Sequence, residues 1–236
     1  MAEVARPRLE HIELLKGVDE EQLRRLESRC RWRRYGIGDK IFDRGDSGRQ
    51  VFFVIEGRVN VVDFTLSGRE VAFASAVAGD SFGELAAIDG LPRSTSVVAV
   101  ETTYLGILPH EPFIALLREN AEIAFRVLVR LAEIVRRGDE RIMELSTLAA
   151  THRVYAEILR MAQPDAAVPD LWVVRPLPPL REIASRVSTT RETVARALGQ
   201  LYPSGLLRRK GRNLYLMDRT ALQQKIYAWQ LESSVK

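Results

Sequence analysis

The sequence of 236 residues has little of several residue types that define common classes of protein. It has one cysteine, Cys30, so it forms no internal disulfide and cannot supply the roughly four thiolates of an iron–sulfur cluster. Its three histidines, His11, His110 and His152, are scattered and match no metal-ligand spacing. We therefore expect neither a disulfide framework nor a metal site.

Long apolar runs and catalytic sets are missing as well. No run reaches the roughly 18 to 20 apolar residues needed to span a bilayer, and residues 1–6 lack the apolar core of a secretory signal. We recognise no Ser/His/Asp set and no Walker-type phosphate loop. The sequence therefore predicts a cytoplasmic protein that is not an enzyme and has no membrane partner.

The composition that remains is ordinary, but the charge is unevenly distributed. Hydrophobic residues make up 46% and charged residues 28% of a chain long enough for two compact domains. The net charge is +4, yet residues 176–212 hold eight basic and two acidic side chains, which leaves −2 for the rest. A local basic region favours a partner that is a polyanion, although a solvated basic face is the alternative.

Residues 35–108 have the texture of an antiparallel β-domain. Short β-branched or aromatic runs are separated by Gly, Asp and Ser turns, at intervals typical of a sandwich or barrel. The predicted strands lie near residues 40–42, 51–55, 58–62, 71–74, 95–100 and 104–108. Residues 8–30 before them predict short helical turns.

Residues 109–148 predict one long amphipathic helix. Its apolar stripe follows steps of three and four residues through Ile123, Val127, Leu131, Ile134, Ile142, Leu145 and Leu148. The β-domain can cover part of such a stripe, and a second copy of the helix can cover the rest. We therefore expect a homodimer.

The basic region predicts two short helices joined by a tight turn, over residues 180–187 and 190–201. Thr189 and Glu192 have the spacing of a capping box at the start of the second helix. Residues 205–216 predict a β-hairpin whose basic tip, with Arg209 and Lys210, would lie against phosphates. A surface helix pair without a ligand is the alternative, but this order of elements favours double-stranded DNA as a partner.

Two motifs carry a resemblance to a known family. The first is Thr190-Arg191-Glu192-Thr193-Val194-Ala195-Arg196 in the second short helix, and the second runs from Gly79 through Gly83-Glu84-Leu85 to Arg93-Ser94-Thr95. Over nearly its whole length the sequence resembles the cAMP receptor protein/fumarate-nitrate regulator family. The first motif is similar to the family's recognition helix, and the second to the phosphate-binding cassette of cyclic-nucleotide-binding domains.

The resemblance implies a set of site residues. Arg93 would bind the cyclic phosphate, Glu84 would accept a hydrogen bond from the ribose 2′-hydroxyl, and Ser94 would add a hydroxyl. The implied nucleotide-binding residues are Phe82, Gly83, Glu84, Leu85, Arg93, Ser94, Thr95, Gly138 and Asp139. The implied DNA-binding residues are Thr190, Arg191, Glu192 and Arg196, with Arg209 and Lys210 on the hairpin.

Several alternatives stay open at this level. Gly138-Asp139 stands where cAMP-responsive relatives have a Thr-Ser pair. Asp139 either accepts hydrogen bonds from the nucleotide base, which would allow a response to cGMP as well as cAMP, or is a solvated helix residue. Glu84 and Arg93 either bind a ligand or pair with each other. Glu192 either caps its helix or contacts a base. The chain is either a cyclic-nucleotide receptor, a regulator without that ligand, or a haem-based sensor, for which no ligand residue is well placed.

The predicted fold class is therefore α+β. It comprises an N-terminal antiparallel β-roll over residues 1–110, a dimerisation helix over 111–149 and a winged helix-turn-helix over 150–236. The predicted function is an allosteric homodimeric transcription regulator that binds cAMP and/or cGMP, without a metal. It would bind a palindromic DNA site with GTGA-like half-sites and act together with RNA polymerase.

Overall fold

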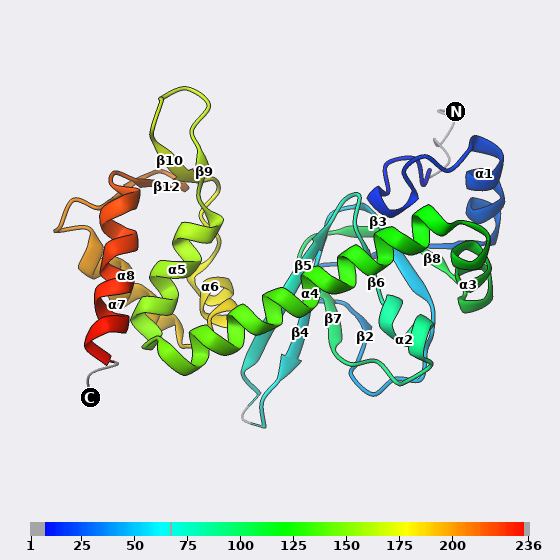
Figure 1. The fold of residues 1–236 in the computed structure, drawn as a ribbon, viewed down its shortest axis with the longest axis horizontal. Helices are drawn as coiled ribbons and strands as arrows, with labels where there is room; N and C mark the ends of the chain where they lie inside the picture. The colour runs from blue at the N-terminus through cyan, green and yellow to red at the C-terminus, as the bar shows by residue number, and fades with distance from the viewer. Residues whose placement is uncertain (1–7, 67, 234–236) are drawn as a thin grey trace. The chain divides into compact units, whose positions relative to one another are not determined.

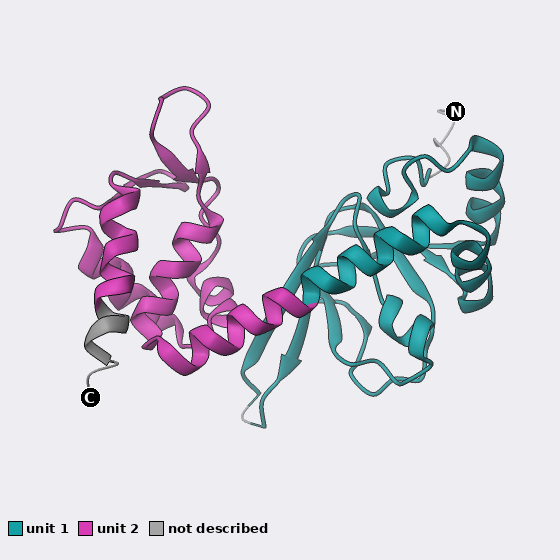
Figure 2. Cartoon of the chain, in the orientation of Figure 1, with its two compact units in different colours: residues 1–134 teal, residues 135–236 magenta. Residues whose placement is uncertain are grey.

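The computed structural model describes residues 8–66 and 68–233 and divides the chain into two compact units. They comprise residues 1–134 and 135–236, and the boundary falls within helix α4 (Ala121–Thr147) (Figure 2). The α+β class, with antiparallel sheets, a long helix and a C-terminal helix-turn-helix, is confirmed (Figure 1). The predicted divisions at residues 110 and 149 are finer than these two units and stay predictions.

The first unit is built around two antiparallel sheets with strand orders β1-β8-β3-β6 and β2-β7-β4-β5. Their strands are β1 (Arg31–Tyr35), β2 (Lys40–Phe42), β3 (Val51–Glu56), β4 (Arg58–Phe64), β5 (Glu70–Val77), β6 (Ser81–Phe82), β7 (Ser96–Ala99) and β8 (Thr103–Leu108). The helices of this unit are the 3₁₀ turn η1 (Glu13–Leu15), α1 (Glu20–Arg29), α2 (Glu84–Asp89), α3 (His110–Glu119) and the start of α4.

Strand β3 explains how the sheets and helices share one domain. Successive side chains of a strand point to opposite faces, so Phe52 belongs to the core between the sheets and Phe53 to the core under the helices. Phe113 of α3 and Ile123 of α4 are fully buried in the second of these cores. Burial of each such side chain stabilises the fold by about 1.5 to 3 kcal/mol. Helices α3 and α4 are therefore packed firmly against the β-domain.

The sequence-based prediction was incomplete in two places in this unit. Strand β1 was missed because Arg31, Arg33 and Arg34 hide the alternation of polar and apolar side chains. Trp32 of this strand nevertheless packs closely on Gly106, where an added Cβ would lie 2.8 Å from the Trp32 ring. The single helix predicted over 109–148 is wrong, because α3 ends at Glu119 and α4 begins at Ala121. Asn120 is extended between them, and its side chain accepts a hydrogen bond from the Ile123 amide.

The second unit contains the end of α4 and the rest of the chain. Its elements are α5 (Ala150–Met161), β9 (Gln163–Pro164), β10 (Trp172–Val174), α6 (Leu180–Arg186), α7 (Arg191–Leu201), β11 (Leu207–Lys210), β12 (Asn213–Leu216) and α8 (Arg219–Ser233). The strands form one antiparallel sheet in the order β11-β12-β10-β9. The predicted packing of α6 on α7 is confirmed, since Ile183, Val194 and Leu198 share one buried core. The hairpin β11–β12 is the predicted wing.

A comparison of two glycines tests the tight connection between β3 and β4. Gly57 has φ +84°, and a Cβ there would lie 2.4 Å from the backbone oxygen of Thr102, whereas Gly38 has φ +86° with nothing within 4 Å. We expect Gly38→Ala to lower the free energy of unfolding by about 1 kcal/mol, from the backbone conformation alone. We expect Gly57→Ala to lower it by at least about 3 kcal/mol, because the clash adds to that cost. Equal losses in urea unfolding would contradict this packing.

Candidate functional site

The first candidate site surrounds the junction of β6 and α2. Gly83 lies between them with φ 88°, and a Cβ there would be 2.7 Å from Arg93 Nη1 and 3.0 Å from the Gln50 backbone oxygen. Only glycine combines this backbone conformation with such close neighbours. The motif that resembled a phosphate-binding cassette therefore wraps tightly around the Arg93 guanidinium.

Arg93 is a buried cation without a counter-ion in the described part of the chain. Its side chain donates to the backbone oxygens of Gly83 (2.9 Å) and Gln50 (2.7 Å), and its guanidinium carbon lies 4.2 Å from the centre of the Phe42 ring. Among residues 8–66 and 68–233 no carboxylate lies within salt-bridge distance of it, and the buried Nε has no hydrogen-bond partner. Burial lowers the pKa of Arg93 below its ordinary value, against the opposing effect of Asp46 and Glu84. The site thus retains an unused donor and positive charge.

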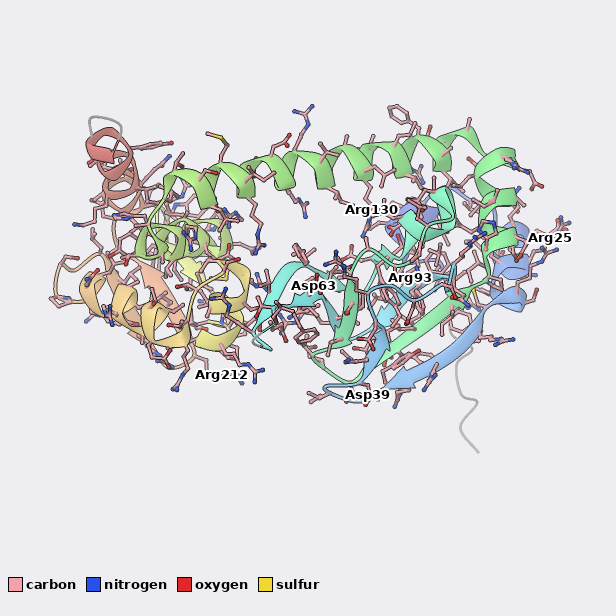
Figure 3. The ribbon with its side chains drawn as sticks, turned by 90° about the horizontal axis from the view of Figure 1, so that it is seen from below. Arg25, Asp39, Asp63, Arg93, Arg130 and Arg212 are labelled. Carbon is pink, nitrogen blue, oxygen red and sulfur yellow. The ribbon has the colours of Figure 1, made fainter. Side chains whose placement is uncertain are left out.

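Glu84 is also buried, and its partner is Arg130 of α4. Arg130 Nε lies 3.0 Å from Glu84 Oε1, which also accepts from the Ser81 hydroxyl at 3.2 Å. Arg130 donates in addition to the Ser81 backbone oxygen. Figure 3 labels Arg93 in the β-domain and Arg130 on the helix above it. The alternative of a Glu84–Arg93 salt bridge is therefore wrong, because Glu84 pairs with Arg130 instead.

The structure brings some of the predicted nucleotide-binding residues together and separates others. Gly83, Glu84 and Arg93 meet at one place, whereas Phe82 is buried and stacks on Phe52 with ring centres 4.9 Å apart. Leu85 and Ser94 are exposed, and Thr95 is half-buried. Gly138 and Asp139 are exposed on α4 within the second unit. The nucleotide-binding roles of all these residues stay predictions.

Two residues of this site were missed in the sequence. Gln50 contributes its backbone oxygen to Arg93, and no pattern in the sequence indicates that contact. Arg130 had a detectable signal, because it lies on the same helix face as the buried residues Ile123 and Val127. A charged residue on a buried face needs a partner, and Glu84 is that partner.

The second candidate site is the helix-turn-helix of α6 and α7. The Thr190 hydroxyl accepts a hydrogen bond from the Thr193 amide at 3.2 Å, so Thr190 caps α7. The predicted cap at Thr189 is wrong, because that side chain is buried between the helices and Glu192 occupies the second helical position. Hydrogen bonds to its own amide and to Thr190, with the nearby Arg191, lower the pKa of Glu192 below its ordinary value. Glu192 is therefore ionised and can accept hydrogen bonds at neutral pH.

The predicted DNA-contacting side chains lie on the solvent side of this unit. Arg191, Glu192 and Arg196 are exposed on α7, opposite its buried face. In the wing, Lys210 pairs with Asn213 next to the turn at Gly211, and Arg209 Nε donates to the Gly211 backbone oxygen at 3.3 Å. Exposed cations on a helix and a neighbouring hairpin are the arrangement that contacts a duplex in winged helix-turn-helix proteins.

A metal site and a membrane-spanning helix are both absent from the described part of the chain. No group of three or more His, Cys, Asp or Glu residues there could hold a metal ion. None of the helices over residues 8–66 and 68–233 is long and apolar enough to cross a membrane. Cys30 is half-buried, and burial raises the pKa of its thiol to about 12, so it is protonated at neutral pH.

Comparisons with known proteins match both parts of the chain that hold the candidate sites. Residues 32–120 match the model of the cyclic nucleotide-binding domain, and residues 152–225 match that of the Crp-like helix-turn-helix domain. The chain is 32% identical to the cyclic AMP receptor protein of Thermus thermophilus, over 83% of this chain and 88% of that protein. It is 29% identical to the cAMP-activated global transcriptional regulator Vfr of Pseudomonas aeruginosa, over 86% and 95%. The solved catabolite activator protein of Thermus thermophilus is 29% identical, with a TM-score of 0.51 over 92% and 99%.

Replacement of Arg93 tests whether this cation serves the fold or a ligand. Arg93→Met keeps an apolar side chain against Phe42 and removes a buried charge whose Nε has no partner. The substitution leaves the Gly83 and Gln50 backbone oxygens without this donor, but it also removes a desolvated charge, so we expect the free energy of unfolding without ligand to fall by less than about 3 kcal/mol. Urea unfolding of the two proteins measures this, and a loss of about 3 kcal/mol or more would assign Arg93 a structural role.

Proposed function

The chain belongs to the cAMP receptor protein/fumarate-nitrate regulator family of DNA-binding transcription regulators, and on that premise we propose that a cyclic nucleotide controls its binding to DNA. The observation that carries the proposal is the buried Arg93, with an unpartnered Nε and no carboxylate partner among the described residues. A cyclic phosphate supplies one negative charge on two adjacent oxygens, which matches the geometry of a guanidinium. The ligand thus completes a site that the folded chain leaves unsatisfied.

The neighbouring groups favour a ribose phosphate over a simple anion. Glu84 is a buried carboxylate that can accept a hydrogen bond from the ribose 2′-hydroxyl while Arg130 holds it in place. The exposed Ser94 can add a hydroxyl next to Arg93. A hydrogen-bond acceptor beside a buried cation suits a ligand that carries both a hydroxyl and a phosphate.

Helix α4 provides a surface that fits a second copy of the chain. Phe125, Leu128, Ala132, Val135, Asp139 and Ile142 follow each other at alternating steps of three and four, as the a and d positions of heptads do. Four of them are large and apolar, and each is between 61% and 63% exposed. The opposite face of the same helix, with Ile123 and Val127, is buried within the protomer. The occupant of the exposed stripe is the same stripe of a second protomer, which gives a homodimer.

Asp139 is the one charged residue of this stripe, so the two Asp139 carboxylates of a dimer would lie at the same level of the seam. Carboxylates accept hydrogen bonds from the N1–H and N2–H of guanine or from the adenine amino group. We assign Asp139, with Gly138 beside it, to base recognition, and a response to both cAMP and cGMP follows from that assignment.

The DNA target is a palindrome, because a two-fold dimer presents two copies of α7. Arg191, Glu192 and Arg196 contact base edges of a GTGA-like half-site in the major groove, and Arg209 and Lys210 contact phosphates. The half-sites lie about 34 Å apart, one turn of the duplex. The nucleotide shifts the population of dimers towards the helix register that meets this spacing, and DNA binding then allows contact with RNA polymerase in the cytoplasm.

Calorimetric titration of the nucleotide-stripped protein with cAMP and, separately, cGMP tests the receptor assignment. We expect roughly micromolar binding of at least one nucleotide, and binding weakened at least about 100-fold in Arg93→Met, since a charge-assisted contact is lost. The control is Arg118→Met, which removes an exposed arginine of α3.

In the same titration Asp139→Ala should change the ratio of the two affinities, and an unchanged ratio would remove Asp139 from base recognition. No heat with either nucleotide would contradict the receptor assignment. It would favour a family member that binds DNA without a cyclic nucleotide or senses another effector.

A pair of neighbouring substitutions tests the seam. Val135 and Ile134 are both exposed and apolar, but only Val135 lies on the stripe proposed here. Ile134 belongs to the stripe predicted from the sequence, which the more exposed stripe through Val135 replaces as the proposed seam. We expect Val135→Glu to convert the dimer to a monomer, because two like charges would face each other in an apolar contact. Ile134→Glu carries the same charge about 100° around the helix and should remain dimeric. Sedimentation velocity at micromolar concentration measures both, and a dimeric Val135→Glu would rule out this seam.

A further inference from the structure

The turn between α6 and α7 adopts a conformation that needs support from outside. Ser188 has φ 52°, in the left-handed region that disfavours residues other than glycine. Thr189 next to it is buried, and Thr190 caps α7 two residues after the turn. The conformation at Ser188 therefore determines where the recognition helix begins and in which direction it leaves.

Two arginines from outside the helix-turn-helix hold this turn. Arg141 of α4 donates from Nη2 to the Ser188 hydroxyl at 3.1 Å. Arg153 of α5 donates to the backbone oxygens of Val187, at 3.0 Å, and Ser188, at 3.4 Å. The remaining Arg153 nitrogen, Nη1, donates to the backbone oxygen of Leu148 at 2.8 Å, one residue after α4 ends. The hydroxyl of the turn is thus bonded to α4, and its carbonyls are bonded to Arg153, which also contacts the residue that follows α4.

A chain of ion pairs joins the same elements at a second place. Arg160 of α5 pairs with Glu144 of α4 and with Glu157, a buried carboxylate of its own helix. Glu157 in turn lies 3.4 Å from Arg186 of α6. Because Glu157 is buried, its contact with Arg186 is screened less by solvent than the more exposed pair of Arg160 and Glu144. The end of α4 is therefore connected to α6 as well as to the turn, so bending at the α4–α5 junction would break several interactions at once.

We propose that Arg141 and Arg153 are positioning residues that attach the recognition helix to α4, so that a change in α4 at the dimer seam is transmitted directly to α7. The proposal rests on the proposed function, since α4 is the element that a bound nucleotide and a second protomer would move. The planar guanidinium of each arginine offers donors in fixed directions, which suits it to hold a turn in one conformation. The interaction to be tested is the hydrogen bond from Arg141 to Ser188, because it is the direct contact between α4 and the turn.

The test uses two variants that remove this hydrogen bond from opposite sides, Arg141→Ala and Ser188→Gly. Glycine adopts φ 52° freely, so Ser188→Gly should not lower the melting temperature, and it remains informative if Arg141→Ala folds poorly. The measurements are the nucleotide affinity by calorimetry and the affinity for a duplex with two GTGA-like half-sites by fluorescence anisotropy, with and without saturating cyclic nucleotide. We expect nucleotide affinity within about twofold of the wild type and a nucleotide-induced gain in DNA affinity about tenfold smaller.

Three comparisons separate positioning from a general effect on stability. The double variant should lose no more of the gain than Arg141→Ala alone, because the hydrogen bond from Arg141 to Ser188 is already absent from that variant. Arg141→Lys keeps a donor that can reach the Ser188 hydroxyl and should restore part of the gain. Lys225→Ala removes an exposed cation of α8 in the same unit and should leave the gain unchanged.

The proposal is overturned if Ser188→Gly, or a folded Arg141→Ala, keeps the full wild-type gain, or if either loses its nucleotide affinity. A wild-type protein that shows no response to cAMP or cGMP would contradict the proposed function instead. In that case the DNA affinity without ligand decides the present inference. A loss of about fivefold in both variants supports it, and an unchanged affinity overturns it.

Discussion

A single buried guanidinium constrains much of the N-terminal unit. Arg93 has been removed from water without a carboxylate partner among the described residues, so the surrounding chain compensates with the backbone oxygens of Gly83 and Gln50 and with the face of Phe42. That arrangement requires glycine at position 83 and fixes the connection from β6 to α2. Glu84 cannot neutralise Arg93 because Arg130 holds it elsewhere. An anion is the ligand that we propose for this positive site.

Helix α4 links that site to the rest of the molecule through different faces. Ile123, Val127 and Arg130 lie against the β-domain, and Arg141 and Glu144 lie against the helix-turn-helix unit. The remaining face is the exposed apolar stripe that we assign to the second protomer. A helix with these three faces is suited to couple the effector domain, a partner and the DNA-binding unit, which is the allosteric control that we propose.

The sequence predicted those parts of the structure that follow from local periodicity. The alternation around Phe52 and Phe53, the two short helices and the basic hairpin depend on neighbours in the chain, and all are confirmed. Strand β1 was missed because this edge strand carries charged residues on both faces. The break at Asn120 was missed because a single capping residue interrupts an otherwise continuous apolar stripe. The partner of Glu84 is 46 positions away in a helix, and no local pattern indicates such a pair. The motifs therefore located the site, while its ion pairs required the fold.

In the regulator that we propose, the nucleotide site and the DNA site are thermodynamically linked. The most direct test is the dissociation constant of the cyclic nucleotide, measured by calorimetry with and without a saturating duplex that carries two GTGA-like half-sites. Linkage predicts tighter nucleotide binding on DNA, by the same factor by which the nucleotide tightens DNA binding, typically about 5- to 150-fold. An identical constant in both titrations would show that the two sites are independent and would contradict the account.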